Sequence, residues 1–344
     1  MAATLSQQIL TIAARRSRWT MREIVFWLAA LATVFLVPAW HPILNEIAIF
    51  GLFALSLDLI LGYAGIVSLG QAAFFGFGAY AAGLLANGVV AEPVLGLLAA
   101  GAMSAILGFI ASFLVLRGSD LTRLMVTLGV ALVLGEAANR LAWLTGGADG
   151  LQVTVGPVLG LFDLSPLFPT TSYAYSLAVV FILFVLARRL VASPFGLSLR
   201  SIRDNPLRAA AIGIPVNRRL VAIYTIAAAY AGVAGALTAQ TAQTVSLDVF
   251  GFERSADVML VLIIGGTGYL YGGLAGACLF RSLQDVLSTF SAQHWHFYIG
   301  LILVALVLVG RDHLTRSWAA VMAPLGRLIP ARWRFRDGAA PREV

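Results

Sequence analysis

Lysine is absent from this chain of 344 residues, because all 23 residues in the combined lysine and arginine count are arginine. Its absence excludes mechanisms that need a lysine ammonium, including the P-loop lysine and Schiff-base catalysis. Four histidines and a single cysteine, Cys278, provide no ligand set for a metal and no disulfide within the chain. We therefore expect no catalytic residue, no metal site and no cofactor, and no ATP hydrolysis by the chain itself.

Charged residues are scarce as well. They make up 11% of the chain, whereas 60% of the residues are hydrophobic and the mean hydropathy is +0.90. This composition excludes a soluble globular protein. We predict an all-α polytopic membrane protein with about 8–10 transmembrane helices, some of them broken or re-entrant at glycine-rich segments.

Apolar stretches long enough to cross a bilayer follow one another along most of the chain. The expected spans lie near residues 24–40, 43–62, 64–86, 94–116, 123–144, 173–191, 219–240 and 297–310. The first stretch follows several arginines and can also be read as the hydrophobic part of a signal peptide. Its length favours an uncleaved first span.

The arginines predict the orientation of these spans. They occur in residues 1–22, 117–123 and 188–219, whereas residues 87–93 and 145–172 contain none. The positive-inside rule then places both termini in the cytoplasm and accounts for the net charge of +7, so we expect contact with the lipid bilayer and no nucleic-acid partner. The expected parts are a basic N-terminal segment (1–22), a single transmembrane domain (23–310) and a basic cytoplasmic tail (311–344).

The segment 192–218 is the long polar interruption on the arginine-rich side. Its sequence predicts two short helices, the first capped by Ser193 and the second by Asn205, each followed at once by proline. Gly213 and Pro215 are expected to close the second helix. Such a helix pair suits the docking of a soluble partner.

Each of these two helices carries a narrow apolar stripe. The stripe residues are Phe195, Leu199 and Ile202 in the first helix, and Leu207, Ala210, Ala211 and Ile214 in the second. Arg200, Arg203 and Arg208 are expected to remain free to reach elsewhere.

Glycine interrupts two of the apolar regions, residues 62–80 and the sequence GGTGYLYGG at 265–273. Non-helical backbone inside a membrane persists only where protein or a water-filled cavity satisfies it. We therefore expect a broken or re-entrant pair at 255–290 and a solute pathway along both interruptions. Close helix packing through small residues is the alternative. The expected pathway residues are Gly65, Ser68, Gln71, Phe74, Gly265, Gly266 and Gly268.

Few ionisable residues fall within the spans. Glu136 and Arg140 lie four residues apart on one helix face, so we expect them to neutralise each other. Glu46 and Asp58 fall near span ends, where a solvated, interfacial position is expected.

Five stretches carry a family pattern in the same order along the chain. They are SLGQAAFFGFGAYAAGLL at 68–85, VTLGVALVLGEAANRL at 126–141, LTGGADGL at 144–151, SPFGLSLRSIRDNPLRAAAIGI at 193–214 and VLIIGGTGYLYGGLAGA at 261–277. Through them the chain resembles the LivM-type permeases of branched-chain amino-acid ABC transporters, over nearly the whole membrane region. One departure is Gln71, which stands where many relatives carry His.

The resemblance implies a permease subunit in a bacterial inner membrane. The implied partners are a second homologous permease, two cytoplasmic ATPase subunits, a periplasmic solute-binding protein and a small-molecule solute. In the family, the loop that matches 193–214 couples to the ATPase, so the expected coupling residues are Arg200, Arg203, Asn205, Arg208, Ala210, Ala211 and Gly213.

The solute stays open, because similar permeases serve branched-chain amino acids, urea, amides or aromatic solutes. A secondary transporter driven by an ion gradient is the alternative, and a buried acid at mid-membrane would favour it. In the sequence, only the paired Glu136 approaches that description. An integral-membrane enzyme is disfavoured, since no nucleophile, base and orienting group form a recognisable motif.

Overall fold

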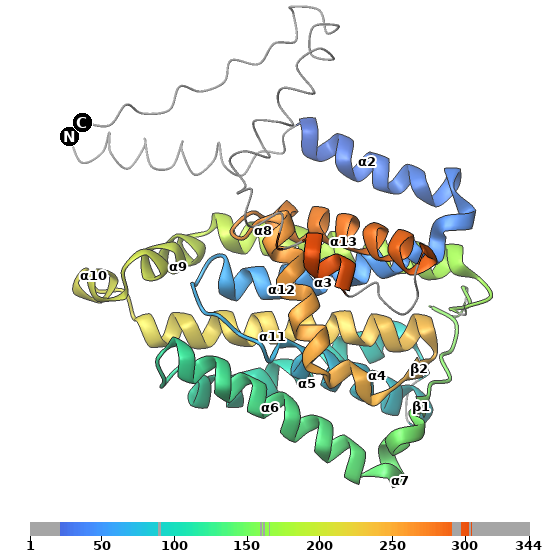
Figure 1. Cartoon of the computed structure of the whole chain (residues 1–344), viewed down its shortest axis with the longest axis horizontal. Helices are drawn as coiled ribbons and strands as arrows, with labels where there is room; N and C mark the ends of the chain where they lie inside the picture. Colours follow the sequence, from blue (N-terminus) through green and yellow to red (C-terminus); the bar gives the residue numbers. More distant parts are fainter. Residues whose placement is uncertain are drawn as a thin grey trace, which may run out of the picture. The chain divides into compact units, whose positions relative to one another are not determined.

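The computed structural model describes residues 21–88, 91–158, 160, 162–164, 166–290, 297–302 and 304. These residues are helical apart from short turns, loops and two brief strands, which confirms the all-α prediction (Figure 1). Most of the basic N-terminal segment, the second half of the predicted span 297–310 and the basic tail lie outside the described residues. The chain forms two compact units, residues 1–282 and 283–344. In the second unit, the end of the last long helix and residues 297–302 and 304 are helical.

The helices of the first half are α2 (Met21–Leu36), the 3-10 turn η1 (Pro38–Trp40), α3 (His41–Leu61), α4 (Gln71–Gly88), α5 (Pro93–Val115), α6 (Asp120–Arg140) and α7 (Ala142–Thr145). They are followed by η2 (Gly147–Asp149), strand β1 (Leu151–Gln152), α8 (Pro169–Ala192), α9 (Pro194–Asp204), α10 (Pro206–Ala211) and α11 (Val216–Ala242). The chain continues through strand β2 (Thr244–Val245), η3 (Leu247–Phe250), α12 (Phe252–Gly265) and α13 (Leu270–Phe290).

Proline and glycine set several helix boundaries. Pro93 and Pro169 stand in the first turn of α5 and α8, where the missing N–H has no helical partner to lose. Pro38 begins a separate 3-10 turn, so the predicted span 24–40 ends early, at Leu36. The predicted span 64–86 becomes helical only at Gln71, because residues 62–70 are irregular.

Helices α3 and α11 form the interior of the first unit. Helix α11 packs against α5, α4 and α3, and α3 packs against α8. Small residues allow these close contacts, since a Cβ atom on Gly78 of α4 would collide with the backbone of Gly232 on α11. Close helix approach at small residues is typical of membrane bundles. At this seam the glycines therefore serve packing.

Helix α2 is attached to α8 by an ion pair and by aromatic rings. Arg188 Nη1 lies 2.8 Å from Glu23 Oε2, and the two side chains are 12% and 20% exposed. Trp27 packs on Phe181 and Phe184 of α8, with ring centroids 4.8 and 5.3 Å apart. These contacts fix α2 along one side of α8.

Five helices of the described part are long and apolar enough to cross a membrane, or six if the bent pair α12–α13 counts as one span. They are α3 with its flanking turns, α5, α6, α8 and α11. Helix α2 is shorter, and α4, a continuous helix that begins with a glutamine and contains four glycines, is not among these five. The chain is thus a multi-pass membrane protein, while the number of eight to ten spans stays a prediction.

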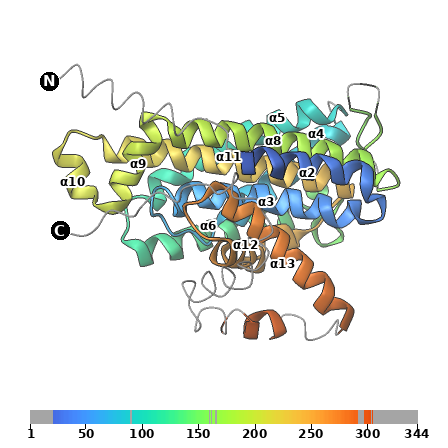
Figure 2. The ribbon, with the colours of Figure 1, turned by 90° about the horizontal axis from the view of Figure 1, so that it is seen from above.

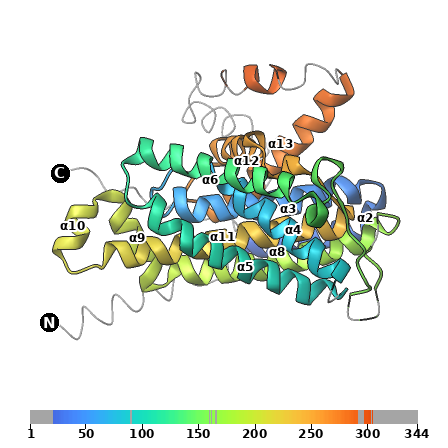
Figure 3. The same cartoon turned by 90° about the horizontal axis from the view of Figure 1, so that it is seen from below.

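The loops gather at two ends of the first unit. Helices α9 and α10 extend beyond one end of α8 and α11 in all three views (Figures 1, 2 and 3). At the other end, β1 and β2 pair antiparallel, with Leu151 opposite Val245. Helix α11 connects these two ends and is about 40 Å long at 1.5 Å per residue.

Candidate functional site

The segment between α8 and α11 forms the two short helices that the sequence predicts. Pro194 opens α9 and Pro206 opens α10. The Asn205 side chain caps α10 by accepting a hydrogen bond from the Arg208 backbone N–H at 3.0 Å. Gly213 has a φ of +88°, a left-handed conformation that favours glycine after a helix end. Ser193 stands at the N-cap position as predicted, but its side chain does not cap α9, because the hydroxyl donates to the Leu190 carbonyl and accepts no hydrogen bond from an α9 N–H.

The two predicted apolar stripes have different surroundings. Leu199 and Ile202 of α9 are buried, as expected for a helix that packs on its own chain. Three residues of the predicted α10 stripe, Leu207, Ala210 and Ala211, are exposed, with Leu207 84% accessible, whereas Ile214 is half-buried and the buried residue of α10 is Ala209. We call the exposed set the α10 surface, and it consists of Leu207, Arg208, Ala210, Ala211 and Ile212.

Arg200 and Arg203 are not free, contrary to the sequence-based expectation. The Arg200 guanidinium lies 5.3 Å from the centre of the Tyr63 ring. Arg203 donates a hydrogen bond from Nη1 to the Gly62 carbonyl, and its stem packs on Gly65. Both arginines of α9 therefore hold the irregular segment that follows α3.

Three distant segments meet where Arg203 contacts Gly62. The Asp58 carboxylate of α3 accepts a hydrogen bond from the Gly268 backbone N–H at 2.7 Å. A Cβ atom on Gly62 would collide with that same Gly268 nitrogen, and the Arg203 guanidinium is close enough to act electrostatically on Asp58. We call Asp58, Gly62, Arg203 and Gly268 the α9 junction. It connects α9 to the end of α3 and to the turn between α12 and α13.

Asp58 differs from its predicted surroundings. It is fully buried, whereas its position near a span end predicts a solvated carboxylate. Within the described residues its second oxygen, Oδ2, has no hydrogen-bond partner. The tertiary contact with Gly268, 210 residues away in the chain, is the reason for its burial.

The irregular segment 62–70 obtains its hydrogen bonds from other helices. The Leu69 N–H donates to Thr127 Oγ1 of α6 at 3.3 Å, and just after the segment, in the first turn of α4, the Ala72 N–H donates to Ser255 Oγ of α12 at 3.1 Å. Non-helical backbone at membrane depth requires such partners. The first predicted interruption is thus present, but it covers residues 62–70 and ends at Gln71.

Three predicted pathway residues around this interruption lie in the packed interior. Ser68, Gln71 and Phe74 are each 1% exposed. Gln71 donates from Nε2 to Ser56 Oγ at 3.2 Å, and the Phe74 ring stands edge-on to Tyr224 with 5.6 Å between centroids. Gly65 lies against Arg203. Their place in a solute pathway stays a prediction.

The second glycine segment forms a sharp bend. The chain direction bends by 111° between α12 and α13, which fits a broken span or a re-entrant pair. Gly266 and Gly268 have φ values of +99° and +80°, so side chains at these positions would strain the backbone. Gly265 lies so close to Gly272 that a Cβ atom on Gly265 would collide with the Gly272 carbonyl oxygen. The bend thus uses glycine both for conformation and for packing.

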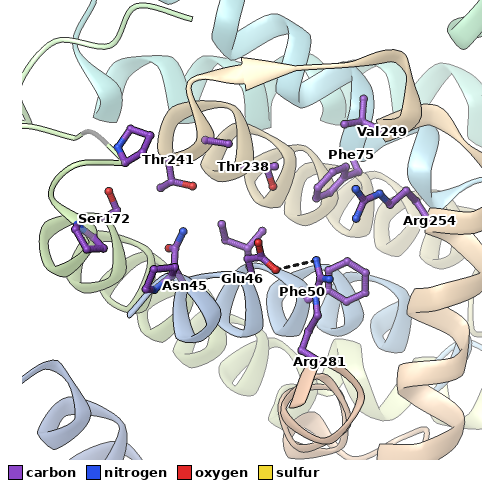
Figure 4. Close-up of a pocket in the computed structure, with 15 residues that line it drawn as sticks. Asn45, Glu46, Phe50, Phe75, Ser172, Thr238, Thr241, Val249, Arg254 and Arg281 are labelled. Carbon is purple, nitrogen blue, oxygen red and sulfur yellow. Dashed lines mark ion pairs between the residues drawn. The ribbon is translucent and has the colours of Figure 1, made fainter. Parts of the chain in front are cut away.

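A cavity of about 440 Å³ lies near the start of α8 and the end of α11, the ends of these helices that are remote from α9 and α10. Figure 4 shows the residues that line it. Its walls come from the first half of α3, the start of α4 and α8, the end of α11, η3 and the two arms of the α12–α13 bend. The polar and charged residues among its lining are Asn45, Glu46, Ser172, Thr238, Thr241, Arg254 and Arg281. None of the predicted pathway residues lines it.

The cavity contains charges that the sequence does not bring together. Arg281 Nη2 of α13 lies 3.2 Å from Glu46 Oε2 of α3, and the Arg281 guanidinium stacks on Phe50 at 4.8 Å from the ring centre (Figure 4). Arg254 of α12 lines the same cavity. Sequence reasoning missed this site, because its residues come from segments more than 200 positions apart.

The Glu136–Arg140 pair forms as predicted. Arg140 Nε lies 2.7 Å from Glu136 Oε1, and both side chains are largely exposed on α6. Among the residues that the structure describes, no three histidine, cysteine, aspartate or glutamate side chains are grouped as metal ligands would be.

Comparisons with known proteins show which family the sequence matches. Residues 41–309 match the family model described as "Branched-chain amino acid transport system / permease component". The chain is 27% identical over 286 residues to the high-affinity branched-chain amino acid transport system permease protein LivM of Escherichia coli (strain K12), and the alignment covers 75% of this chain and 66% of LivM. The Salmonella typhimurium LivM protein is 28% identical, with the same coverage.

A second group of relatives carries a different transport name. The autoinducer 2 import system permease protein LsrC of Enterobacter sp. (strain 638) is 30% identical over 325 residues, which cover 87% of this chain and 90% of LsrC. The chain spans just under two thirds of the length of the LivM relatives. No solved structure matches it.

Proposed function

This chain belongs to the family of permease components of branched-chain amino acid transport systems, and on that premise we propose that it is the membrane-spanning permease subunit of an ATP-binding cassette importer. The proposed solute is a branched-chain amino acid or a related small solute. The proposed partners are two ATPase subunits, a second permease and a solute-binding protein in the periplasm of a bacterial cell. Both termini are then cytoplasmic, and the chain performs no chemistry of its own.

The α10 surface is the observation that supports this assignment most directly. Leu207, on this short, capped helix beyond the ends of α8 and α11, is 84% exposed, and Ile212, directly after the helix, is 69% exposed. Exposed apolar residues beside an arginine suit contact with another protein. In this proposal the α10 surface contacts the ATPase, and ATP-driven motion reaches the membrane helices through Arg203 at the α9 junction.

The predicted coupling residues then divide into two groups. Arg208, Ala210 and Ala211 belong to the α10 surface, while Asn205 and Gly213 shape the ends of α10. Arg200 and Arg203 contact the chain's own Tyr63 and Gly62. We therefore propose that the first group binds the partner and that the two α9 arginines transmit the motion inward.

Leu207→Glu tests the docking proposal. Leu167, in the loop before α8, is also 84% exposed, so Leu167→Glu is a matched control that adds the same charge at the other end of the helices. Each variant is purified from native membranes in mild detergent, and the accompanying ATPase subunits and their ATP hydrolysis are measured. Leu207→Glu should lose the ATPase subunits while Leu167→Glu retains them. Equal recovery from both variants would contradict docking through α10.

The burial of Asp58 supports a second candidate, a transporter driven by a proton gradient. A buried acid at mid-membrane is the feature that would favour such a transporter. Glu136 is exposed and paired, whereas Asp58 is the buried acid among the described residues, although it lies in the last turn of α3. Proteoliposomes that contain this chain alone would then accumulate solute under a proton gradient, and Asp58→Asn would stop the accumulation. We favour the importer, because the permease family model matches residues 41–309, and because Asp58 already accepts a hydrogen bond from the Gly268 N–H.

A further inference from the structure

We propose that the cavity lined by Glu46, Arg254 and Arg281 is a solute-binding site for a small zwitterion, with a carboxylate and an ammonium group on an apolar body. This inference rests on the proposed permease function and assigns the site and the solute chemistry within it. The cavity volume of about 440 Å³ is at the small end of ordinary ligand cavities, which measure about 300–1,000 Å³. A solute of amino-acid size is therefore appropriate.

The carboxylate of the solute is assigned to Arg254. Within the described part of the chain, Arg254 has no ion-pair partner, although its side chain is half-buried and lines the cavity. The second arginine, Arg281, is already paired with Glu46 and stacked on Phe50. Charged residues within membrane spans usually pair or mark a solute path. Arg254 is thus the guanidinium available for a ligand carboxylate, which it can bind with two parallel hydrogen bonds.

The ammonium group is assigned to two neighbouring side chains of α3. Glu46 directs its carboxylate along the cavity wall, and its side chain is 58% exposed (Figure 4). Asn45 lines the same cavity, and its side-chain oxygen is buried and has no hydrogen-bond partner among the described residues. A buried acceptor without a partner is costly, and an ammonium donor in the cavity would satisfy it if the amide turned toward the solute.

The remaining wall suits an apolar side chain. Ile49, Phe75 and Val249 are among the lining residues. Phe75 packs on the fully buried Phe53 with 4.7 Å between ring centroids. An apolar group of the solute would therefore rest on a wall that includes an aromatic ring backed by the core.

Binding of a zwitterion also has a consequence for the bend. The solute ammonium competes with Arg281 for Glu46, and the Glu46–Arg281 pair joins α3 to α13. Arg254 and Arg281 lie about three turns from the bend on its two arms. A solute in the cavity should therefore weaken the attachment of α13 to α3. Helix α13 is one arm of the α12–α13 bend, and the turn of that bend belongs to the α9 junction.

The test is a binding measurement on the full chain in lipid nanodiscs with radiolabelled L-leucine. Competitors are 4-methylpentanoate, which lacks the ammonium, 3-methylbutylamine, which lacks the carboxylate, and the uncharged sugar D-ribose. L-leucine should bind, and each analogue with one charge should compete at least about tenfold less well, as expected for the loss of one charge-assisted contact worth about 1.4 kcal/mol or more. Ribose should not compete.

Variants test whether leucine binds in the cavity and not elsewhere on the protein. Arg254→Gln should weaken leucine binding about tenfold or more, and Arg254→Lys should restore most of it. Arg140→Gln, on the exposed face of α6, is the matched arginine control and should bind as the unmodified chain does. Failure of leucine to bind, equal binding by Arg254→Gln, or competition by ribose at the level of leucine would overturn the inference. ATPase recovery in the Leu207→Glu experiment reports separately on the proposed function, so the two can fail independently.

Discussion

The contacts of the α9 junction predict that Arg203 and Asp58 depend on each other for their contributions to stability. Arg203→Gln removes the hydrogen bond to the Gly62 carbonyl and leaves the buried Asp58 carboxylate without its neighbouring cation. Asp58→Asn removes the buried charge but keeps an oxygen that can accept from the Gly268 N–H. If the two charges depend on each other, the double variant should be more stable than the sum of the single effects predicts.

The burial of the two side chains sets the expected magnitudes. A hydrogen bond from a charged group contributes about 1.5–3 kcal/mol, and Arg203 is 41% exposed, so water replaces part of its contact. We expect Arg203→Gln to lower the free energy of unfolding by about 1–2 kcal/mol and Asp58→Asn by about 1 kcal/mol. A coupling energy of about 1 kcal/mol should separate the double variant from additivity. Arg208→Gln, on the exposed α10 surface, should change stability by less than about 0.5 kcal/mol.

The measurement is unfolding of the purified chain by SDS in mixed micelles, for the two single variants, the double variant and Arg208→Gln. Additive effects of the single changes would refute an electrostatic dependence between Arg203 and Asp58. A loss of stability in Arg208→Gln equal to that in Arg203→Gln would show that the junction contacts are not what stabilises α9.

Three further predictions concern packing and pairing in the first unit. Gly62→Ala places a methyl group against the Gly268 amide and should destabilise the chain by about 1–3 kcal/mol in the same unfolding assay; wild-type stability would contradict the close approach. Gly78→Ala should lower the free energy of unfolding by a similar amount, because its methyl group would collide with α11. Gly129→Ala has open space around its Cβ and should be neutral or stabilising by up to about 1 kcal/mol. A larger loss of stability in Gly129→Ala than in Gly78→Ala would contradict the close contact between α4 and α11. Glu23→Gln should destabilise α2 by about 1–3 kcal/mol because it leaves Arg188, only 12% exposed, without the carboxylate; faster proteolysis near residue 21 is the readout, and unchanged proteolysis would count against this attachment.

Local signals in the sequence were enough to predict α9 and α10. Proline and asparagine act on the turn in which they stand, so Pro194, Asn205 and Pro206 mark the two helix starts without reference to the rest of the chain. The glycine-rich bend between α12 and α13 was predicted for the same reason. In each case the determining residues are neighbours in sequence.

The α9 junction and the cavity could not be predicted in this way. Arg203 contacts a carbonyl 141 residues away, and nothing in its own helix indicates that contact. The cavity likewise depends on how α3 and the α12–α13 bend meet, which places Glu46 beside Arg281. Charged residues near span ends were the available signal, but they do not specify their partners. The exposed α10 stripe was visible as a pattern, while its orientation depended on the packing of α9.

Cys278 provides a way to watch the bend. It is the single thiol of the chain, is exposed, and lies on α13 one turn before Arg281. A fluorophore or spin label attached there needs no engineered cysteine and no removal of competing ones. The same position can therefore report the motion of one arm of the bend in the native sequence, first with solute alone and then with nucleotide and partner subunits added.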